Sequence, residues 1–371
     1  MNASGMDQSP AGTVSSNNAS RRTFLKGVGL ATAAGLAAPL LASTSARAGG
    51  GPLVLGINAP GPWESPPGGY APIGKTWLDL VPHALACRSY RDDVITRWQD
   101  VPTQFPGETS PAGPVKVVAS IRPDPALILG DHPDFENAIK GFIANGMARA
   151  KAGGGQPPDF SSPQLTVWHE AGNLYTKPNL EKGWTQHIVD QLTDPPTVRQ
   201  MHVKMKRWCD EVAAANPTFP RVEYGCIIYG EISQMAPYVP YDPYSLDWYG
   251  IDVYYERDAG WGRGDLVDYT AVSNYMNNFL DLVRSRNITS QVSNPKINVT
   301  ECNANFANAD NRPQFFKNLA RWLDTYPGGR RMLTFFPDPA GPESVTWSHV
   351  VNATVPYTIN ALNIIQGSYG R

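Results

Sequence analysis

Short apolar runs alternate with longer segments of helical period from residue 53 onward. This alternation is typical of βαβ units, in which helices join parallel strands. Some runs are apolar on both faces, as in Val117-Val118-Ala119, which suits strands covered by helices outside and by packed side chains inside a barrel. We expect eight strands, at Leu53 to Asn58, Ala84 to Tyr90, Val115 to Ile121, Leu165 to Trp168, Val222 to Tyr229, Leu246 to Tyr254, Ile297 to Thr300 and Met332 to Phe336.

The segments between these runs carry apolar stripes at helical spacing. The clearest stripe consists of Met201, Met205, Trp208, Cys209 and Val212, whose spacing places them on one face of a helix. No Gly-rich phosphate-binding loop follows the first strand. Eight strands with intervening helices therefore favour an α/β fold of the (β/α)8 TIM-barrel type, in a single domain, over a Rossmann sheet.

The N-terminal segment is of a different kind. Arg21 and Arg22 precede an apolar, alanine-rich stretch, which is followed by Ala46-Arg47-Ala48. A charged segment, a modest apolar segment and a small-x-small site are typical of a secretory signal, and the paired arginines indicate the twin-arginine route. We expect residues 1–48 to be a signal peptide and residues 49–371 to be the barrel domain, secreted or located in a bacterial periplasm or cell envelope. An amphipathic membrane anchor is the alternative.

Charge limits the classes of partner. The chain has 31 Lys and Arg against 33 Asp and Glu, and residues 1–48 contain four of these basic residues and one of the acidic ones, which leaves a net charge of −5 on the remainder. No basic field suited to nucleic acid and no run of like charge suited to a membrane surface is present. We expect neither nucleic acid binding nor stable membrane insertion. The oligomeric state is left open.

The sequence gives little support to metal or thiol chemistry. The four cysteines, Cys87, Cys209, Cys226 and Cys302, permit three complete disulfide pairings, and their spacing does not decide among them. Neither a Cys-x-x-Cys motif nor a Cys/His cluster is present, so we expect no metal and no cofactor. A nucleophilic Cys302 would need a histidine placed to activate it, and we expect a buried structural thiol instead.

Two glutamates stand where expected strands end. Leu165 to Trp168 runs directly into His169-Glu170, and Ile297 to Thr300 runs directly into Glu301. The reacting groups of TIM barrels come from the C-terminal ends of the strands, and the fourth and seventh strands can face each other across the mouth. Glycoside cleavage needs two carboxyl groups flanking the scissile bond. Together the two residues predict a glycoside hydrolase, although either one alone is equally well explained as a surface carboxylate.

These motifs resemble those of the retaining glycoside hydrolases of clan A, and most of all family 26. The resemblance is local and is carried by Trp168-His169-Glu170-Ala171-Gly172-Asn173, by Glu301 and by Gly250-Ile251-Asp252-Val253-Tyr254. It implies that Glu170 is the catalytic acid/base and Glu301 the nucleophile, that His169 binds sugar or tunes Glu170, and that Tyr254 lies near the nucleophile. The implied substrate is a polysaccharide or oligosaccharide, such as a β-mannan or a β-glucan.

The chemistry makes opposite demands on the two glutamates. Glu170 must hold a proton near neutral pH, so we expect an apolar wall and a nearby anion to raise its pKa. Glu301 should stay ionised through donors such as Tyr254 or Arg122. A retaining mechanism further requires the two carboxyl groups to lie about 5–5.5 Å apart.

Other polar and aromatic residues are expected around the pair. Arg122 and Asp252 stand at strand ends and can bind sugar hydroxyls, with a salt bridge at the barrel mouth as the alternative. Aromatic side chains bury the apolar faces of sugar rings, and several aromatic residues lie in or beside the expected βα loops. The expected substrate-binding residues are His169, Tyr254, Arg122, Asp252, Trp168, Asn173 and Trp347.

Two other classes of function compete with this interpretation. A non-catalytic carbohydrate-binding TIM-barrel protein would share the aromatic residues but would not require both glutamates, so their presence favours an enzyme. An esterase would need a Gly-x-Ser-x-Gly elbow, and the sequence contains none.

Overall fold

The fold is seen in a computed structural model. It describes residues 54–58, 85–89, 94–105, 108–110, 113–115, 117–152, 162–171, 183–229, 231–241, 246–255, 265–287, 294–304, 311–328 and 332–335. The expected signal peptide, residues 1–48, lies outside these ranges, and all the described residues belong to one unit, Arg47–Arg371. None of the described helices combines the length and the apolar character of a membrane-spanning segment.

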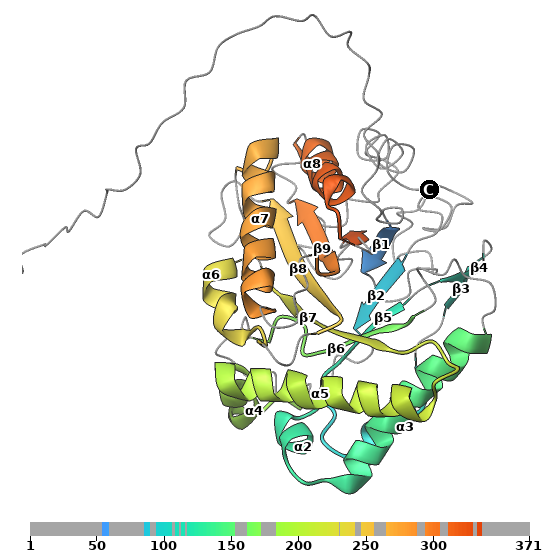
Figure 1. The fold of residues 1–371 in the computed structure, drawn as a ribbon. Coiled ribbons are helices and arrows are strands. Elements are labelled where there is room, and N and C mark those ends of the chain that lie inside the picture. Colours follow the sequence, from blue (N-terminus) through green and yellow to red (C-terminus); the bar gives the residue numbers. More distant parts are fainter. Residues whose placement is uncertain are drawn as a thin grey trace, which may run out of the picture. The chain divides into compact units, whose positions relative to one another are not determined.

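Eight parallel strands form a closed barrel in the hydrogen-bonded order β1-β10-β9-β8-β7-β6-β5-β2 (Figure 1). Every expected strand is present, although β8 begins at Trp248 rather than Leu246 and β9 continues to Ala304. The barrel strands are β1 (Val54–Asn58), β2 (Leu85–Ser89), β5 (Val117–Ile121), β6 (Gln164–Val167), β7 (Glu223–Ile228), β8 (Trp248–Tyr255), β9 (Ile297–Ala304) and β10 (Met332–Phe335).

Helices follow five of these strands in the described part of the chain. They are α2 (Pro125–Leu129) and α3 (Pro133–Ala152) after β5, α4 (Gln186–Leu192) and α5 (Pro195–Ala215) after β6, α6 (Ile232–Met235) and the short η5 (Ala236–Tyr238) after β7, α7 (Tyr269–Arg286) after β8, and α8 (Arg312–Thr325) after β9. Between β2 and β5 the described residues form η1 (Trp98–Asp100) and a two-stranded sheet, β3 (Glu108–Ser110) with β4 (Gly113–Val115). The α/β barrel is thus confirmed, and a helix after every strand stays a prediction.

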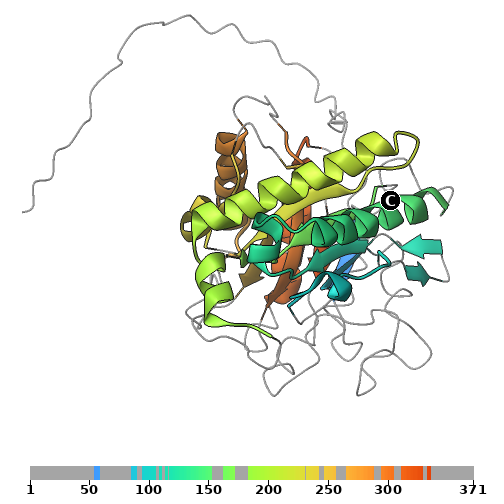
Figure 2. The same ribbon diagram turned by 90° about the horizontal axis from the view of Figure 1, so that it is seen from below.

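Helices α2, α4, α5 and α7 begin at residues whose side chains cap the first turn. At α5, the Asp194 carboxylate accepts a hydrogen bond from the backbone N–H of Thr197 (3.0 Å) and proline occupies the first turn, both of which favour a helix start. The apolar stripe expected on this helix is buried. α5 packs against β7 and α3, and Figure 2 shows α3 and α5 crossing the same side of the sheet. α8 likewise contacts α7 and β9.

Polar side chains occupy part of the barrel interior. Asn298 on β9 donates a hydrogen bond to Gln164 on β6 (3.5 Å), and two strands separate β9 from β6 in the barrel. Because these strands are not neighbours, the bond crosses the interior. Thr166 and Thr300, further along the same two strands, are also buried. This polar interior leads to the C-terminal ends of the strands, where the candidate site lies.

Candidate active site

The turn that follows β6 has an unusual backbone. Trp168 and Glu170 have φ angles of 46° and 56°, in the left-handed region, which bulky residues rarely adopt and which costs on the order of 1–3 kcal/mol per residue. The Trp168 N–H donates to the carbonyl of Ile121 on β5 (3.0 Å), and the Glu170 N–H donates to the carbonyl of Ile227 on β7 (3.2 Å). The turn is therefore held from both sides of β6, and strain held in this way is common at functional sites.

The side chain of Trp168 supports this turn. Its ring is 1% exposed, its indole N–H donates to the carbonyl of Pro123, and it packs edge-on against Trp184 with ring centroids 5.4 Å apart. The Arg122 guanidinium lies over the Trp184 ring, 5.8 Å from its centroid. Trp168 and Arg122 thus lie beside the turn, and substrate contact stays a prediction for both.

A β-bulge determines where Glu301 points. The register between β8 and β9 shifts between Ile251 and Asp252, so that Asp252 pairs with Glu301 and Thr300 is the extra residue on β9. In a regular strand, consecutive side chains point to opposite faces, whereas a bulge redirects the side chains that follow it. Here the Thr300 hydroxyl donates to Asp252 (2.6 Å), and Glu301 accepts from Tyr254. Both consecutive residues therefore reach the same face of β8.

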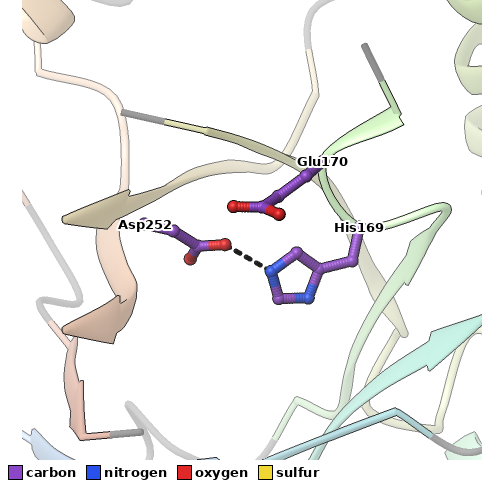
Figure 3. A group of neighbouring side chains, drawn as sticks. All are labelled: His169, Glu170 and Asp252. Atoms are coloured by element: carbon purple, nitrogen blue, oxygen red, sulfur yellow. Dashed lines mark hydrogen bonds and ion pairs between the residues drawn. The ribbon is translucent and has the colours of Figure 1, made fainter. Parts of the chain in front are cut away.

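Five ionisable side chains meet beside this bulge. His169 Nε2 hydrogen-bonds to Asp252 and lies 3.4 Å from Oε1 of Glu301. The Glu170 carboxyl group, from the next position of the β6 turn, points toward Asp252 (Figure 3), and single atoms of His169, Glu170 and Asp252 lie within 4.8 Å of one another. Tyr254 donates its hydroxyl to Glu301. Five of the expected site residues are thus brought together: His169, Glu170, Asp252, Tyr254 and Glu301.

Burial and like charge dominate the electrostatics of this cluster. Burial raises the pKa of Glu301 to about 8, and the charge of Asp252 adds to the rise, while His169 and the Tyr254 hydroxyl oppose it. Burial also raises the pKa of Asp252 to about 7, against hydrogen bonds from Thr300 and Glu170. Near neutral pH the cluster therefore keeps protons that exposed carboxyl groups would have lost.

The expectation that Tyr254 or Arg122 keeps Glu301 ionised is wrong for the ligand-free site. Burial raises the pKa of the Tyr254 hydroxyl well above its ordinary value, so this group remains a donor to Glu301. Its contribution to the pKa of Glu301 is outweighed by burial and by Asp252. Asp252 is fully buried and hydrogen-bonds to Nε2 of His169, and sugar binding by Asp252 stays a prediction.

Two residues of this site were not expected. Thr300 holds Asp252, and a Cβ atom at Gly250 would lie 2.8 Å from Thr300 Cγ2 and 2.9 Å from Ile227 Cγ1. The missing side chain of Gly250 therefore makes room for the bulge. The only sequence signal for Thr300 and Gly250 is that each stands close to an acidic residue. Thr300 directly precedes Glu301, and Gly250 is two positions before Asp252. Two expected residues, Asn173 and Trp347, lie outside the described residues.

One group of described side chains has donor atoms close enough together for a metal ion. Single atoms of His169, Glu170 and Asp252 all lie within 4.8 Å of one another, and imidazole and carboxylate groups bind many divalent metals. His169 and Asp252 hydrogen-bond to each other directly, and the absence of a metal stays an expectation. Nearby Cys302 is a buried free thiol whose pKa burial raises, which disfavours a thiolate nucleophile.

No protein-family model matches the sequence, and no curated protein matches it. Among solved structures, the chain is similar to a 4-O-α-L-rhamnosyl-β-D-glucuronidase from Fusarium oxysporum 12S, with a TM-score of 0.50 and 9% identity over 85% of this chain and 70% of that chain. This likeness shows the fold alone.

Two endo-β-1,4-mannanases of glycoside hydrolase family 26 are also among the similar structures. The catalytic domain from Bacillus sp. JAMB-750 has a TM-score of 0.42 and 13% identity over 69% of this chain and 66% of that chain. A ruminal enzyme has a TM-score of 0.43 and 12% identity over 86% of this chain and 64% of that chain. The chain thus spans slightly less than two thirds of each mannanase.

Proposed function

We propose that this chain is an exported, retaining glycoside hydrolase in which Glu170 is the catalytic acid/base and Glu301 is the nucleophile. The observation that carries this function is the convergence of two carboxyl groups, one from the turn after β6 and one from within the C-terminal half of β9, on one His169–Asp252 pair. Glycoside cleavage requires two such groups, and barrel enzymes carry their reacting groups at these strand ends. The motif resemblance to family 26 supports the two roles.

In the first step, Glu170 gives its proton to the glycosidic oxygen while Glu301 attacks the anomeric carbon. The bond to the leaving oxygen breaks, and a glycosyl ester forms on Glu301. In the second step, Glu170 takes a proton from water, the water oxygen attacks the anomeric carbon, and the Glu301 carboxylate is released. Two inversions give net retention.

The hydrogen bonds of the cluster suit these steps. Glu301 attacks only as a carboxylate, so in the reactive form the proton that the cluster keeps must reside elsewhere in it. Asp252 can hold it, because burial raises its pKa to about 7. The Tyr254 hydroxyl then orients the carboxylate of Glu301, and the donor stays fixed because its own pKa is raised by burial and by Glu301. Fixed donors of this kind need no reorganisation during the reaction.

For the substrate, we propose a β-mannan or a β-glucan-like polysaccharide or oligosaccharide. The support is the motif resemblance to family 26 and the net negative charge, which suits a neutral glycan. The protein is further proposed to be exported by the twin-arginine route, with residues 1–48 removed and residues 49–371 forming a complete (β/α)8 catalytic domain. No cofactor takes part in this mechanism.

A glycan screen tests this function. The exported protein and its Glu301→Gln variant are incubated with β-mannan, β-glucan, xylan, arabinogalactan and a rhamnosyl-glucuronide, and reducing ends and binding are both measured. We expect the natural protein to hydrolyse β-mannan or β-glucan and the variant to bind the same glycan without hydrolysis. Binding without hydrolysis by both proteins would instead indicate a non-catalytic carbohydrate-binding barrel.

A further inference from the structure

Trp168 belongs to the turn after β6 but not to the ionisable cluster of the candidate site. It directly precedes His169 and Glu170 in the sequence. Its side chain is 1% exposed, and its backbone has a φ of 46°, which bulky residues rarely adopt. Such a conformation persists only where the surrounding structure determines it. The contacts that hold Trp168 therefore help to decide where the next two side chains point.

Two hydrogen bonds of Trp168 act on opposite sides of its N–Cα bond, the bond whose torsion is φ. The backbone N–H donates to the carbonyl of Ile121 (3.0 Å), which holds the peptide group before Cα. The indole N–H donates to the carbonyl of Pro123, which holds the side chain and with it the direction of the Cα–Cβ bond. The bonds from Cα to Cβ and to the carbonyl carbon keep a nearly constant angle. Holding both the N–H and the side chain therefore fixes φ.

The acceptor of the indole bond is itself held in place. Pro123 lies between β5 and α2 and pairs with Ile95 in an isolated parallel bridge. The N–H of Ile95 donates to the carbonyl of Arg122 (2.9 Å), and its carbonyl accepts from the N–H of Asp124 (2.9 Å). The side chain of Asp124 in turn caps α2. The indole of Trp168 is thus tied to a braced segment rather than to a loose loop.

Packing restricts the indole ring as well. The ring of Trp184 lies edge-on to it, with centroids 5.4 Å apart and an angle of 83° between the ring planes, an arrangement that aromatic pairs favour. Trp184 directly precedes Thr185, whose side chain caps α4. The start of α4 therefore packs against the indole. Together the hydrogen bond and this contact leave the side chain of Trp168 little freedom to turn.

We propose that Trp168 is a positioning residue for Glu170, because the bond from its indole N–H to the Pro123 carbonyl fixes the left-handed turn that aims the Glu170 carboxyl group. This role rests on the function proposed for Glu170 as the acid/base, and it needs no contact between Trp168 and a sugar. Displacing a reacting group by ~1 Å can cost on the order of 100-fold in rate. Loss of the indole bond should therefore impair the step in which Glu170 protonates the leaving group.

The test compares Trp168→Phe with a matched control, Trp248→Phe. Trp248 is also a buried tryptophan, and its indole N–H donates to the backbone carbonyl of Glu223 (3.1 Å). Trp248 and Glu223 are the first residues of β8 and β7, so this bond lies at the opposite ends of the strands from the turn. Each variant thus removes one buried indole and one bond to a carbonyl. A second pair of variants carries 3-benzothienylalanine at position 168 or 248, in which sulfur replaces the indole N–H and the shape is kept.

The kinetic readout is kcat/KM on aryl β-mannobiosides and aryl β-cellobiosides, because this ratio reports the step in which the leaving group departs. Phenol is a poor leaving group that needs protonation, whereas 2,4-dinitrophenolate departs without it. For both variants at position 168 we expect kcat/KM to fall about tenfold on the phenyl glycoside and less than about twofold on the dinitrophenyl glycoside. The variants at position 248 should slow both substrates alike, if at all. General destabilisation has no reason to depend on the leaving group.

Hydrogen exchange gives a second readout that needs no substrate. The amides of Trp168 and Glu170 are both hydrogen-bonded, so the variants at position 168 should speed amide exchange at residues 168–170, and those at position 248 should not. Equal loss of kcat/KM on both leaving groups, unchanged exchange in this segment, or natural behaviour of the benzothienyl variant would overturn the positioning role. If Glu170→Ala itself shows no dependence on the leaving group, the acid/base role fails instead, and the exchange result still decides whether the indole bond holds the turn.

Discussion

Asp252 and Glu301 lie in a buried environment that disfavours two negative charges. Burial is the first cause of both raised pKa values, and the charge of Asp252 is the next cause at Glu301. Catalysis needs Glu301 ionised, so the reactive form becomes more abundant as the pH rises toward about 8. His169, which bonds to Asp252 and lies 3.4 Å from Glu301, links the two carboxyl groups. The acidic limb of the pH–rate profile should therefore reflect the pKa values of the carboxyl groups in this cluster.

Replacing Asp252 by asparagine should move that limb. The substitution removes a negative charge beside Glu301, so the pKa of Glu301 should fall and the acidic limb of kcat/KM should shift to lower pH by ~1 unit. The maximal rate should also fall, because His169 loses its carboxylate partner. Rates measured between pH 4 and 9 for the natural protein and Asp252→Asn check both effects. An acidic limb that stays in place would show that Asp252 does not set the ionisation of Glu301.

At the scale of elements, the β9 bulge and the β6 turn place the two glutamates. In a regular strand Glu301 would face away from Thr300, yet both residues bond to side chains on one face of β8. The bulge fits because Gly250, which pairs with Asn298 and lies beside the Thr300 side chain, has no side chain of its own. On the other side of the site, β5 and β7 hold the backbone of the turn. Local irregularities on two strands thus create a site that regular strands would not form.

Gly250→Ala should disturb this arrangement. The new Cβ would lie 2.8 Å from Thr300 and 2.9 Å from Ile227, so β8 or Thr300 must move, and overpacking of this kind costs roughly 1–3 kcal/mol. Activity should fall as Thr300 is pushed from Asp252. The control is Gly141→Ala on α3, where a Cβ meets nothing within 4 Å and the helix should gain up to about 1 kcal/mol. Denaturant unfolding and kcat measure both effects, and equal stability of the two variants would contradict the packing described.

The elements themselves could be predicted from the sequence, because apolar periodicity reflects which faces are buried. The stripe from Met201 to Val212 and the eight apolar runs led to the observed helix and strands. Glu170 could be placed just beyond a strand end for the same reason, whereas Glu301 lies within β9, which continues to Ala304. The left-handed backbone of Trp168 and Glu170 could not, since bonds from distant Ile121 and Ile227 hold it. The burial of Asp252 and of Glu301, which is the first cause of the raised pKa of each, also depends on contacts across the barrel.

At the scale of the whole molecule, buried titratable groups make stability depend on pH in two opposite ways. The pKa of His202 is lowered to about 3 in the folded state, so its contribution to stability is present above its unfolded pKa of about 6.5 and is lost as the pH falls toward 3. The pKa values of Asp252 and Glu301 are raised to about 7 and about 8. Their contribution is full below unfolded values of about 4 and is lost as the pH rises through the folded values.

Between about pH 6.5 and 8, His202 no longer makes the stability of the fold depend on pH. In this window the pH dependence comes from the carboxyl groups of Asp252 and Glu301. The Tm of the natural protein should therefore fall as the pH rises across this window, with up to about 1.4 kcal/mol lost per pH unit for each proton released. Glu301→Gln removes one of the two carboxyl groups, so its Tm should fall less steeply and should exceed that of the natural protein at pH 8. Calorimetry of both proteins at several pH values provides the measurement. Parallel curves would mean that Glu301 is not protonated in the fold.

The roles of Glu170 and Glu301 are tested most directly by the stereochemistry of azide rescue. Each alanine variant is incubated with azide and 2,4-dinitrophenyl β-mannobioside or β-cellobioside, and the glycosyl azide is identified by proton NMR. Glu301→Ala should yield the azide of inverted configuration, because azide takes the place of the nucleophile. Glu170→Ala should yield the azide of retained configuration, because azide attacks the glycosyl-enzyme without a general base. Exchanged stereochemistry would reverse the two roles, and a loss of less than about 100-fold on natural glycan in both variants would exclude them as the catalytic pair.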